Sequence, residues 1–271
     1  MEYLETDTHI YSNAYRKKFL LYRAEDCSRL SKEGKTRLNK KDIQPQECTR
    51  RKAVDGSRKM TDKVIENNQV MIMGTIASEF HFSHEIFGEG FYMVEVKVSR
   101  LSDSADTIPF MVSERLIDVT ENYIGRNITV IGQFRSYNRH EERKNKLVLS
   151  VFAREVEFID EIGENAKTNH IYLDGYICKP PIYRKTPLGR EIADLLLAVN
   201  RPYGKSDYIP CICWGRNARF ASGFEVGSRC AIWGRIQSRE YMKKVGEEDL
   251  ERRVAYEVSV SKLEIMGEDI Q

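Results

Sequence analysis

The chain has 271 residues, of which 41% are hydrophobic and 31% are charged, and its formal net charge is +2. This length accommodates two domains that each bury a core, and this composition is typical of a soluble globular protein. No apolar run approaches the roughly 20 residues that cross a bilayer, and the polar start lacks a signal-peptide core, so we expect a cytoplasmic protein with no membrane partner.

An internal repeat divides the chain. The segment Asn68–Gly74 (NQVMIMG) returns as Asn169–Gly175 (NHIYLDG), and two glycines recur in each copy at a constant spacing. These glycines are Gly125, Gly132, Gly227 and Gly234. A period of about a hundred residues is too long for a solenoid and fits a small domain, so we predict a tandem of two related modules, residues 60–166 and 167–271.

Residues 1–59 precede the repeat, match neither copy and carry a net charge of +6. They lack a sustained apolar period, so we predict a basic and largely disordered leader. Such a leader is an arm that binds nucleic acid, a solvated extension, or sequence upstream of a true start at Met60. We favour the last two interpretations, because runs of charge are usually solvated.

Both modules show short strands separated by turn signals. In the first module we predict five strands and, after the third, a helical turn: 68–76, 90–100, 107–112, 114–118 (the turn), 126–137 and 146–159. In the second we predict five strands and a short helix in the same order: 169–178, 190–201, 207–214, 216–224 (the helix), 228–241 and 253–266. This is the arrangement of an OB-fold, a Greek-key barrel whose exposed face commonly holds oligonucleotides. The predicted fold class is therefore all-β, with two tandem five-stranded OB-fold barrels after a largely disordered N-terminal segment.

Alternation along the strands of the second module places rings and cations on one outward face. On its third strand Ile209, Cys211 and Cys213 face the barrel, whereas Tyr208 and Trp214 point outward. The outward residues of the fourth strand, and two more after the second strand, are Arg235, Gln237, Arg239, Tyr241, Tyr203 and Lys205. Flat rings accept any base by stacking and cations follow phosphates, so this face suits single-stranded nucleic acid.

Three motifs stand in order and at fitting spacing in the second module: Leu197–Arg201 (LAVNR), Tyr208–Arg216 (YIPCICWGR) and Gly234–Tyr241 (GRIQSREY). Through them residues 167–266 resemble the DNA-binding domain of the bacterial single-stranded DNA-binding protein family. The resemblance implies that four rings stack on bases, namely Tyr203, Tyr208, Trp214 and Tyr241. The cations predicted to contact DNA are Arg201, Lys205, Arg216, Arg235 and Arg239. Trp233 lies outside this set, and its place stays open between a bulge that turns it inward and a subunit interface.

The first module keeps the scaffold but loses most of these side chains. Thr107 stands opposite Tyr208 and Ser113 opposite Trp214, and residues 60–166 carry a net charge of −7 against +3 for residues 167–271. Negative charge repels phosphate and forfeits counterion release. We therefore expect this module to organise the assembly as a spacer, a docking module or part of the oligomer. Three of its side chains remain candidates for DNA contact: Arg135, Tyr137 and Arg139.

No pattern in the chain predicts catalysis. His81 and His84 form a close pair that we expect in a loop, and Cys211 and Cys213 lack the spaced pairs of zinc sites, so we predict buried thiols in a reducing compartment. A phosphate-cradling glycine loop and a nucleophile elbow are both missing. We predict no enzyme activity, no cofactor and no metal.

The predicted function is sequence-independent binding and protection of single-stranded DNA during replication, recombination or repair. Proteins of the family commonly work as four OB-folds, so the resemblance implies a homodimer, with replication or repair proteins as candidate partners. The family's flexible tail with an acidic tip has no counterpart after Gly267, so we do not expect recruitment through such a tail. Two alternatives stay open: an RNA-binding OB protein, and a protein-interaction module that acts as a replication accessory factor.

Overall fold

A computed structural model of the chain describes residues 67–100, 102, 104–141, 144–164, 166–244 and 250–267. Within these ranges, the side chains of residues 138–146, 203, 243, 244 and 250 are not described. The basic leader, residues 1–59, lies outside the described residues. The fold below belongs to the compact unit that begins at Lys63.

The first repeat forms a closed barrel. Its strands are β1 (Asn68–Ile76), β2 (His81–Ile86), β3 (Glu89–Ser99), β4 (Ala105–Ser113), β5 (Asn127–Glu141) and β6 (Lys144–Ile159). Around the barrel the order is β1, β3, β4, β6 and β5, and the ring closes because β3 and β5 both pair with β1. Only β4 and β6 run parallel among these pairs. Strand β2 lies outside the ring, on the edge of β3.

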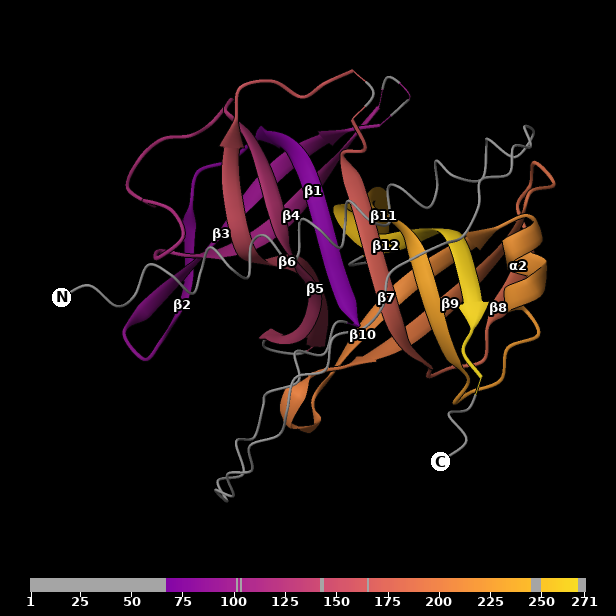
Figure 1. The fold of residues 1–271 in the computed structure, drawn as a ribbon. Helices are drawn as coiled ribbons and strands as arrows, with labels where there is room; N and C mark the ends of the chain where they lie inside the picture. The colour runs from indigo at the N-terminus through magenta and orange to yellow at the C-terminus, as the bar shows by residue number, and fades with distance from the viewer. Residues whose placement is uncertain are drawn as a thin grey trace, which may run out of the picture. The chain divides into compact units, whose positions relative to one another are not determined.

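The second repeat forms a barrel of the same topology (Figure 1). Its elements are β7 (Asn169–Ile177), β8 (Ile182–Lys185), β9 (Glu191–Asn200), the 3-10 turn η1 (Pro202–Gly204), β10 (Ser206–Trp214), α2 (Arg216–Ala221), β11 (Arg229–Lys244) and β12 (Leu250–Ile265). The ring order is β7, β9, β10, β12 and β11, with β10 and β12 parallel. This strand order is that of the OB-fold, and the all-β fold class is confirmed.

Three details of the sequence-based assignment were wrong. The predicted helical turn at 114–118 is a plain turn closed by the bond from Leu116 N to Ser113 O (3.0 Å), and the short helix of the second repeat ends at Ala221 rather than Phe224. Strands β2 and β8 were not predicted, because both are short and largely exposed and therefore show no alternation of apolar residues. The remaining strands start and end within four residues of the predicted bounds.

Two of the recurring glycines sit at β-bulges, between Ile131 and Gly132 and between Trp233 and Gly234. A Cβ on Gly132 would lie 2.1 Å from the backbone oxygen of Phe152, and one on Gly234 would lie 2.2 Å from that of Ser259. A backbone oxygen cannot move aside as a flexible side chain can. The tight curvature of each barrel at this point therefore requires glycine, which explains why the repeat preserves it.

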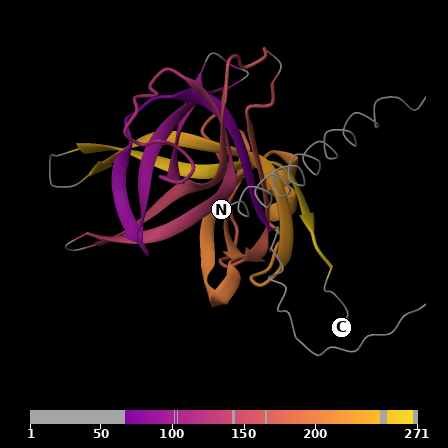
Figure 2. The same ribbon diagram turned by 60° about the vertical axis from the view of Figure 1, so that its left-hand side comes forward.

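Strands β1 and β7 pair antiparallel and join the two barrels into one continuous sheet (Figure 1). Each barrel also holds a buried or half-buried asparagine in an equivalent place. Asn68 exchanges two hydrogen bonds with the backbone of Phe134 (2.7 and 2.8 Å), and Asn169 exchanges two with the backbone of Ile236 (2.7 and 2.9 Å). The long hairpins β5–β6 and β11–β12 project on the same side of the view in Figure 2.

Candidate nucleic-acid interface

The outward face of the second barrel is built from β9, β10, β12 and β11. The alternation predicted on β10 is confirmed: Ile209, Cys211 and Cys213 are buried, whereas Tyr208 is 48% exposed and Trp214 is 39% exposed. On β11, Tyr241 is 37% exposed and pairs with Arg253 of β12. These three rings are therefore open to solvent on one curved sheet. The backbone of Tyr203 lies in η1, and its side chain lies outside the described residues.

Three of the predicted cations are exposed beside these rings. Arg239 lies on the same face of β11 as Tyr241, with its guanidinium carbon 5.9 Å from the centre of that ring, and its Nε is 3.8 Å from a Glu257 carboxylate oxygen. Lys205 follows η1, and Arg216 begins α2 directly after Trp214. Exposed rings and exposed cations thus occur together on this barrel, a combination that is typical of single-strand binding.

The other two predicted cations each donate a hydrogen bond to the first barrel. Arg201 donates from Nε to Asp207 Oδ2 (2.6 Å) and from Nη2 to Ser136 O on β5 of the first barrel (2.9 Å). Arg235 donates to Asp106 Oδ2 on β4 of the first barrel (3.2 Å). Burial, with the charge of Arg100 nearby, lowers the pKa of Arg235, while Asp106 opposes this shift. Both guanidinium groups therefore already have carboxylate partners inside the chain.

Strand β8 adds a cation that the sequence did not indicate. Arg184 pairs with Ile192 of β9, and Ile192 pairs with Trp214 of β10, so the three form one row across the face. Arg184 Nε donates to Asp194 Oδ2 (2.9 Å), and the Arg184 side chain remains 53% exposed. Arg184 could be placed on this face only by knowing that β8 pairs with β9. The sequence of β8 resembles a turn and does not predict that pairing.

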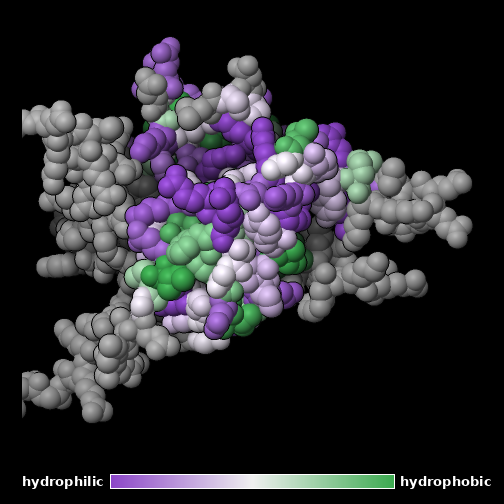
Figure 3. Space-filling view, turned by 90° about the vertical axis from the view of Figure 1, so that its right-hand side faces the viewer, coloured by the Kyte–Doolittle hydropathy of each residue, from purple (hydrophilic) through white to green (hydrophobic). Residues whose placement is uncertain are grey.

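The view from the side of α2 and β8 shows apolar patches set among hydrophilic side chains (Figure 3). Ile182 of β8 and Phe220 of α2 are exposed apolar residues of these elements, and Leu188 is exposed in the connection that follows β8. Ile182 pairs with Asp194, and Asp194 pairs with Ile212 of β10, so these three form a second row across β8, β9 and β10.

The corresponding face of the first barrel is closed by its own side chains. Ser113, which stands in the place of Trp214, is buried and donates to Glu89. The Phe91 ring stacks between His84 (5.2 Å) and Phe152 (5.8 Å). Arg135 covers Phe152, with its guanidinium carbon 3.9 Å from the ring centre. These rings stack on one another, which leaves less of their surface for bases.

His81 and His84 lie on strand β2 rather than in a loop, so this expectation was wrong. The His84 ring instead stacks on Phe91 and contacts Ser83 Oγ through Nδ1 (3.0 Å). Among the residues that the structure describes, no group of histidine, cysteine, aspartate and glutamate side chains has the arrangement of a metal site. No helix in the same ranges is long and apolar enough to cross a membrane.

Trp233 lies on the outer side of the sheet formed by β7, β11 and β12. The bulge predicted as one option falls between Trp233 and Gly234. The Trp233 ring packs on Tyr172 with the ring centres 5.1 Å apart, and Lys262 Nζ lies 4.5 Å from the Trp233 ring centre. This partly exposed cluster is separate from the row of Tyr208 and Trp214.

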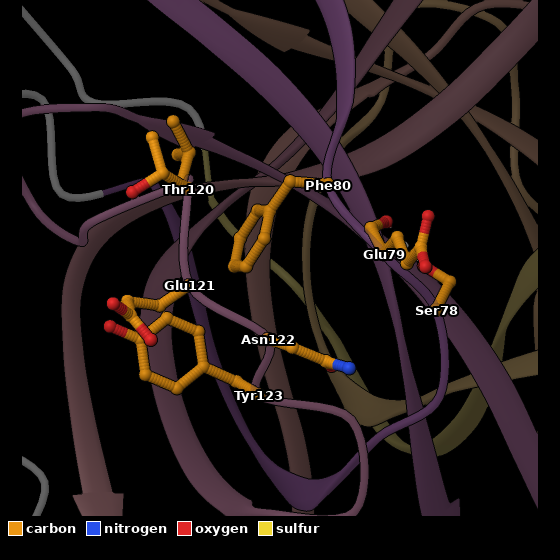
Figure 4. Close-up of a pocket in the computed structure, with 8 residues that line it drawn as sticks. Ser78, Glu79, Phe80, Thr120, Glu121, Asn122 and Tyr123 are labelled. Atoms are coloured by element: carbon orange, nitrogen blue, oxygen red, sulfur yellow. Dashed lines mark hydrogen bonds between the residues drawn. The ribbon is translucent and has the colours of Figure 1, made fainter.

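A hollow of about 290 Å³ opens at one end of the first barrel (Figure 4). The Phe80 and Tyr123 rings lie edge to face across it, 6.1 Å apart, and Glu79 and Glu121 lie on its rim. None of the predicted DNA-binding residues lines this hollow. Its volume is just below the roughly 300–1,000 Å³ of small-ligand sites, and two carboxylates do not suit a phosphate.

The two barrels, their strand order and the open face of rings and cations define an OB-fold protein, a class whose faces hold oligonucleotides or oligosaccharides. Residues 168–266 match the model of the Single-strand binding protein family. The match covers the second barrel and leaves the first barrel outside it.

Curated relatives match the same region. Single-stranded DNA-binding protein 2 of Listeria innocua is 36% identical over 86 residues, which is 29% of this chain and 54% of that protein. The single-stranded DNA-binding protein of Halalkalibacterium halodurans is 34% identical over 110 residues, which is 38% of this chain and 59% of that protein. The chain thus spans about half the length of the curated relatives it matches.

A solved structure matches both barrels. The wild-type single-stranded DNA binding protein from Thermus aquaticus superposes with a TM-score of 0.59 at 20% sequence identity, covering 74% of this chain and 93% of that chain. At this identity the likeness shows the fold alone.

Proposed function

We propose that the second barrel binds single-stranded DNA without preference for sequence and protects it during replication, recombination or repair. The observation that carries the proposal is one open face on which Tyr208, Trp214 and Tyr241 are each exposed by more than a third. Stacking on such rings contributes roughly 1–3 kcal/mol per base and is tolerant of sequence, because every base has a flat π face. The names of the relatives favour DNA over RNA as the ligand.

The set of DNA contacts that we propose differs from the sequence-based set in three places. Tyr203 stays a prediction, because its side chain lies outside the described residues. Arg201 and Arg235 are assigned to the contact between the barrels, because each donates to a residue of the first barrel. Arg184 is added, because it shares a row with Trp214. The remaining contacts are Tyr208, Trp214, Tyr241, Lys205, Arg216 and Arg239.

We further propose that the first barrel mainly organises the assembly and that two chains associate to give four OB-folds. The outer side of the β7–β11 sheet offers the Trp233 and Tyr172 rings for such a contact. The assembly is proposed to act by binding alone, without catalysis. Sedimentation of the chain, whose mass is 31.5 kDa, should give a dimer, and Trp233→Arg should give a monomer. A monomeric wild-type chain at micromolar concentration contradicts this part.

The DNA proposal is tested by replacing Tyr208 and Trp214 together with alanine. If each ring stacks one base, affinity for an oligothymidylate should fall by on the order of 2–6 kcal/mol. The matched control is Phe82→Ala, which removes an exposed ring from β2 of the first barrel and should leave affinity unchanged. Equal binding of the double variant and the wild type would falsify the stacking face. Comparison of matched DNA and RNA oligomers in one buffer tests the choice of sugar.

A further inference from the structure

A cluster of arginines lies where β5 of the first barrel meets β10 of the second. Asp207 accepts the backbone N–H of Ser136 (2.5 Å) and the Nε of Arg201 (2.6 Å), and Arg201 also donates to Ser136 O (2.9 Å). Arg135 precedes Ser136, and Arg154 lies on the neighbouring strand β6. We call Arg135, Arg154 and Arg201, with the carboxylate of Asp207, the junction cluster.

The charge of Arg135 in this cluster is poorly compensated. Its Nη2 donates to the neutral amide oxygen of Gln133 (3.0 Å), and its buried Nε has no hydrogen-bond acceptor within the described part of the chain. Burial, followed by the charges of Arg201 and Arg154, lowers the pKa of Arg135 to about 10, and Asp207 offsets this only in part. A second anion near Arg135 would lower the cost of keeping its guanidinium group charged.

In the equivalent contact, between β4 of the first barrel and β11 of the second, the positive charges are better compensated. There Asp106 accepts both from Arg100 (2.6 and 2.7 Å) and from Arg235 (3.2 Å), so two arginines bond one carboxylate directly. In the junction cluster the charges of Arg201 and Arg154 and the single carboxylate of Asp207 act on Arg135, which itself donates to the uncharged amide of Gln133. Unlike Arg235, which donates to a carboxylate, Arg135 has a buried Nε without an acceptor among the described residues, so positive charge is less well compensated on the β5–β10 side.

The junction cluster adjoins the binding face of the second barrel. The backbone N–H of Tyr208 donates to Ser136 Oγ (2.8 Å), so the first ring of the face stands directly beside the residue that follows Arg135. We expect a strand that stacks on Tyr208 to place its next phosphate close to the arginines that the first barrel contributes to the cluster. Neighbouring cations that track a backbone are the expected continuation of a stacking face.

We propose that the junction cluster binds a phosphate diester of the DNA strand that stacks on the second barrel, so that the strand passes from Tyr208 onto the first barrel. This inference rests on the proposed function and deepens it. Arg135 and Arg154 supply the contact from the first barrel. The negative overall charge of that module does not oppose the contact, because close opposite charges outweigh more distant ones that salt screens.

The test uses the full chain with Arg135→Gln and Arg154→Gln together, and oligothymidylates of about 8 and about 30 nucleotides, since one OB-fold occupies about 4–16. The longer strand should bind to the double variant about tenfold more weakly than to the wild type. The slope of log affinity against log salt should become shallower by about 0.7 for each phosphate that the variant no longer neutralises. The shorter strand, held by the second barrel, should bind as before.

Arg126→Gln is the matched control, because Arg126 also lies over a phenylalanine ring of the first barrel, 4.1 Å from the centre of Phe158. It should leave both the affinity and the salt slope unchanged. If Arg135→Gln does not fold, Arg154→Gln alone alters an exposed side chain and should still reduce the slope by about 0.7. Arg135→Lys, which keeps the charge, should retain most of the slope.

Two contrary outcomes are distinguishable. If the double variant binds the longer strand with wild-type affinity and slope while the shorter strand binds normally, the junction cluster is not a phosphate site and the proposed function stands. If the wild-type chain binds neither strand, the proposed function and this inference both fail.

Discussion

At the scale of single residues, the bulge glycines show how strictly one backbone position is fixed. Replacing Gly132 by alanine should destabilise the chain by about 1–3 kcal/mol, because the new Cβ would lie 2.1 Å from Phe152 O and the barrel must shift to accept it. Gly163→Ala is the control, since a Cβ there meets nothing within 4 Å. Urea unfolding of both variants measures the difference, and equal stability would show that the bulge relaxes freely.

The buried cysteines give a prediction about reactivity. Burial and the neighbouring thiol of Cys230 raise the pKa of Cys213 to about 12 from an ordinary value of 9.0, and burial with the charge of Asp174 raises that of Cys230 to about 12. Alkylation proceeds through the thiolate. At pH 8 both thiols should therefore react roughly a thousandfold more slowly than an ordinary cysteine.

Peptide-resolved mass spectrometry after brief iodoacetamide treatment measures these rates. Cys178 is only half-buried, and although burial also raises the pKa of its thiol, it should label faster than Cys213 and Cys230. In urea, Cys178, Cys213 and Cys230 should label at similar rates. Rapid labelling of Cys213 in the native chain would show that the barrel opens on the timescale of the reaction.

At the scale of elements, the alternation of apolar and polar residues predicted the strands that line each core, but it did not predict the edge strand β8. The burial of Ile209, Cys211 and Cys213 opposite Tyr208 and Trp214 follows from the two-residue period of a strand with one face in a core. Strand β8 has no such signal, because all four of its residues are exposed and its existence depends on hydrogen bonds to β9. Sequence therefore predicts strands that contribute to a core and misses those that only extend an edge.

Strand β8 also carries a prediction about DNA binding. Arg184→Gln should weaken oligothymidylate binding several-fold and make the salt dependence shallower by about 0.7, because it removes one cation from the row that contains Trp214. Arg190→Gln changes an exposed arginine in the connection after β8 and is the control. An unchanged salt slope for Arg184→Gln restricts the binding face to β9–β12.

At the scale of the whole molecule, the contacts between the repeats depend on residues far apart in the chain. Arg235 and Asp106, which bond at 3.2 Å, are 129 residues apart, and Asp207 reaches Ser136 across 71 residues. The sequence marks Arg201 and Arg235 only as cations on strands near a binding motif. No local pattern identifies their carboxylate partners, so their part in the contact between the barrels could not be predicted from the sequence.

Asp106 makes the contact between the barrels depend on pH. Its carboxylate is buried and accepts from Arg100 and from the backbone N–H of Ser238 (2.8 Å). Burial by itself raises the pKa of Asp106, but the hydrogen bonds from Arg100 and Ser238 and the charges of Arg100 and Arg235 outweigh it and hold the pKa below the ordinary 3.8. A lowered pKa contributes stability that is present above pH 3.8 and is lost as the pH falls through the folded-state value.

Asp106→Asn should therefore lower the free energy of unfolding by about 2–4 kcal/mol at pH 7, because it leaves Arg100 and Arg235 without their shared carboxylate. The difference from the wild type should narrow as the pH falls below 3.8, where the wild-type carboxylate also begins to lose its charge. Asp160→Asn, at an exposed position after β6, should change little at either pH. Urea unfolding at pH 7 and pH 3 measures both effects. A difference that stays constant with pH would mean that Asp106 holds the barrels through shape and neutral hydrogen bonds rather than through its charge.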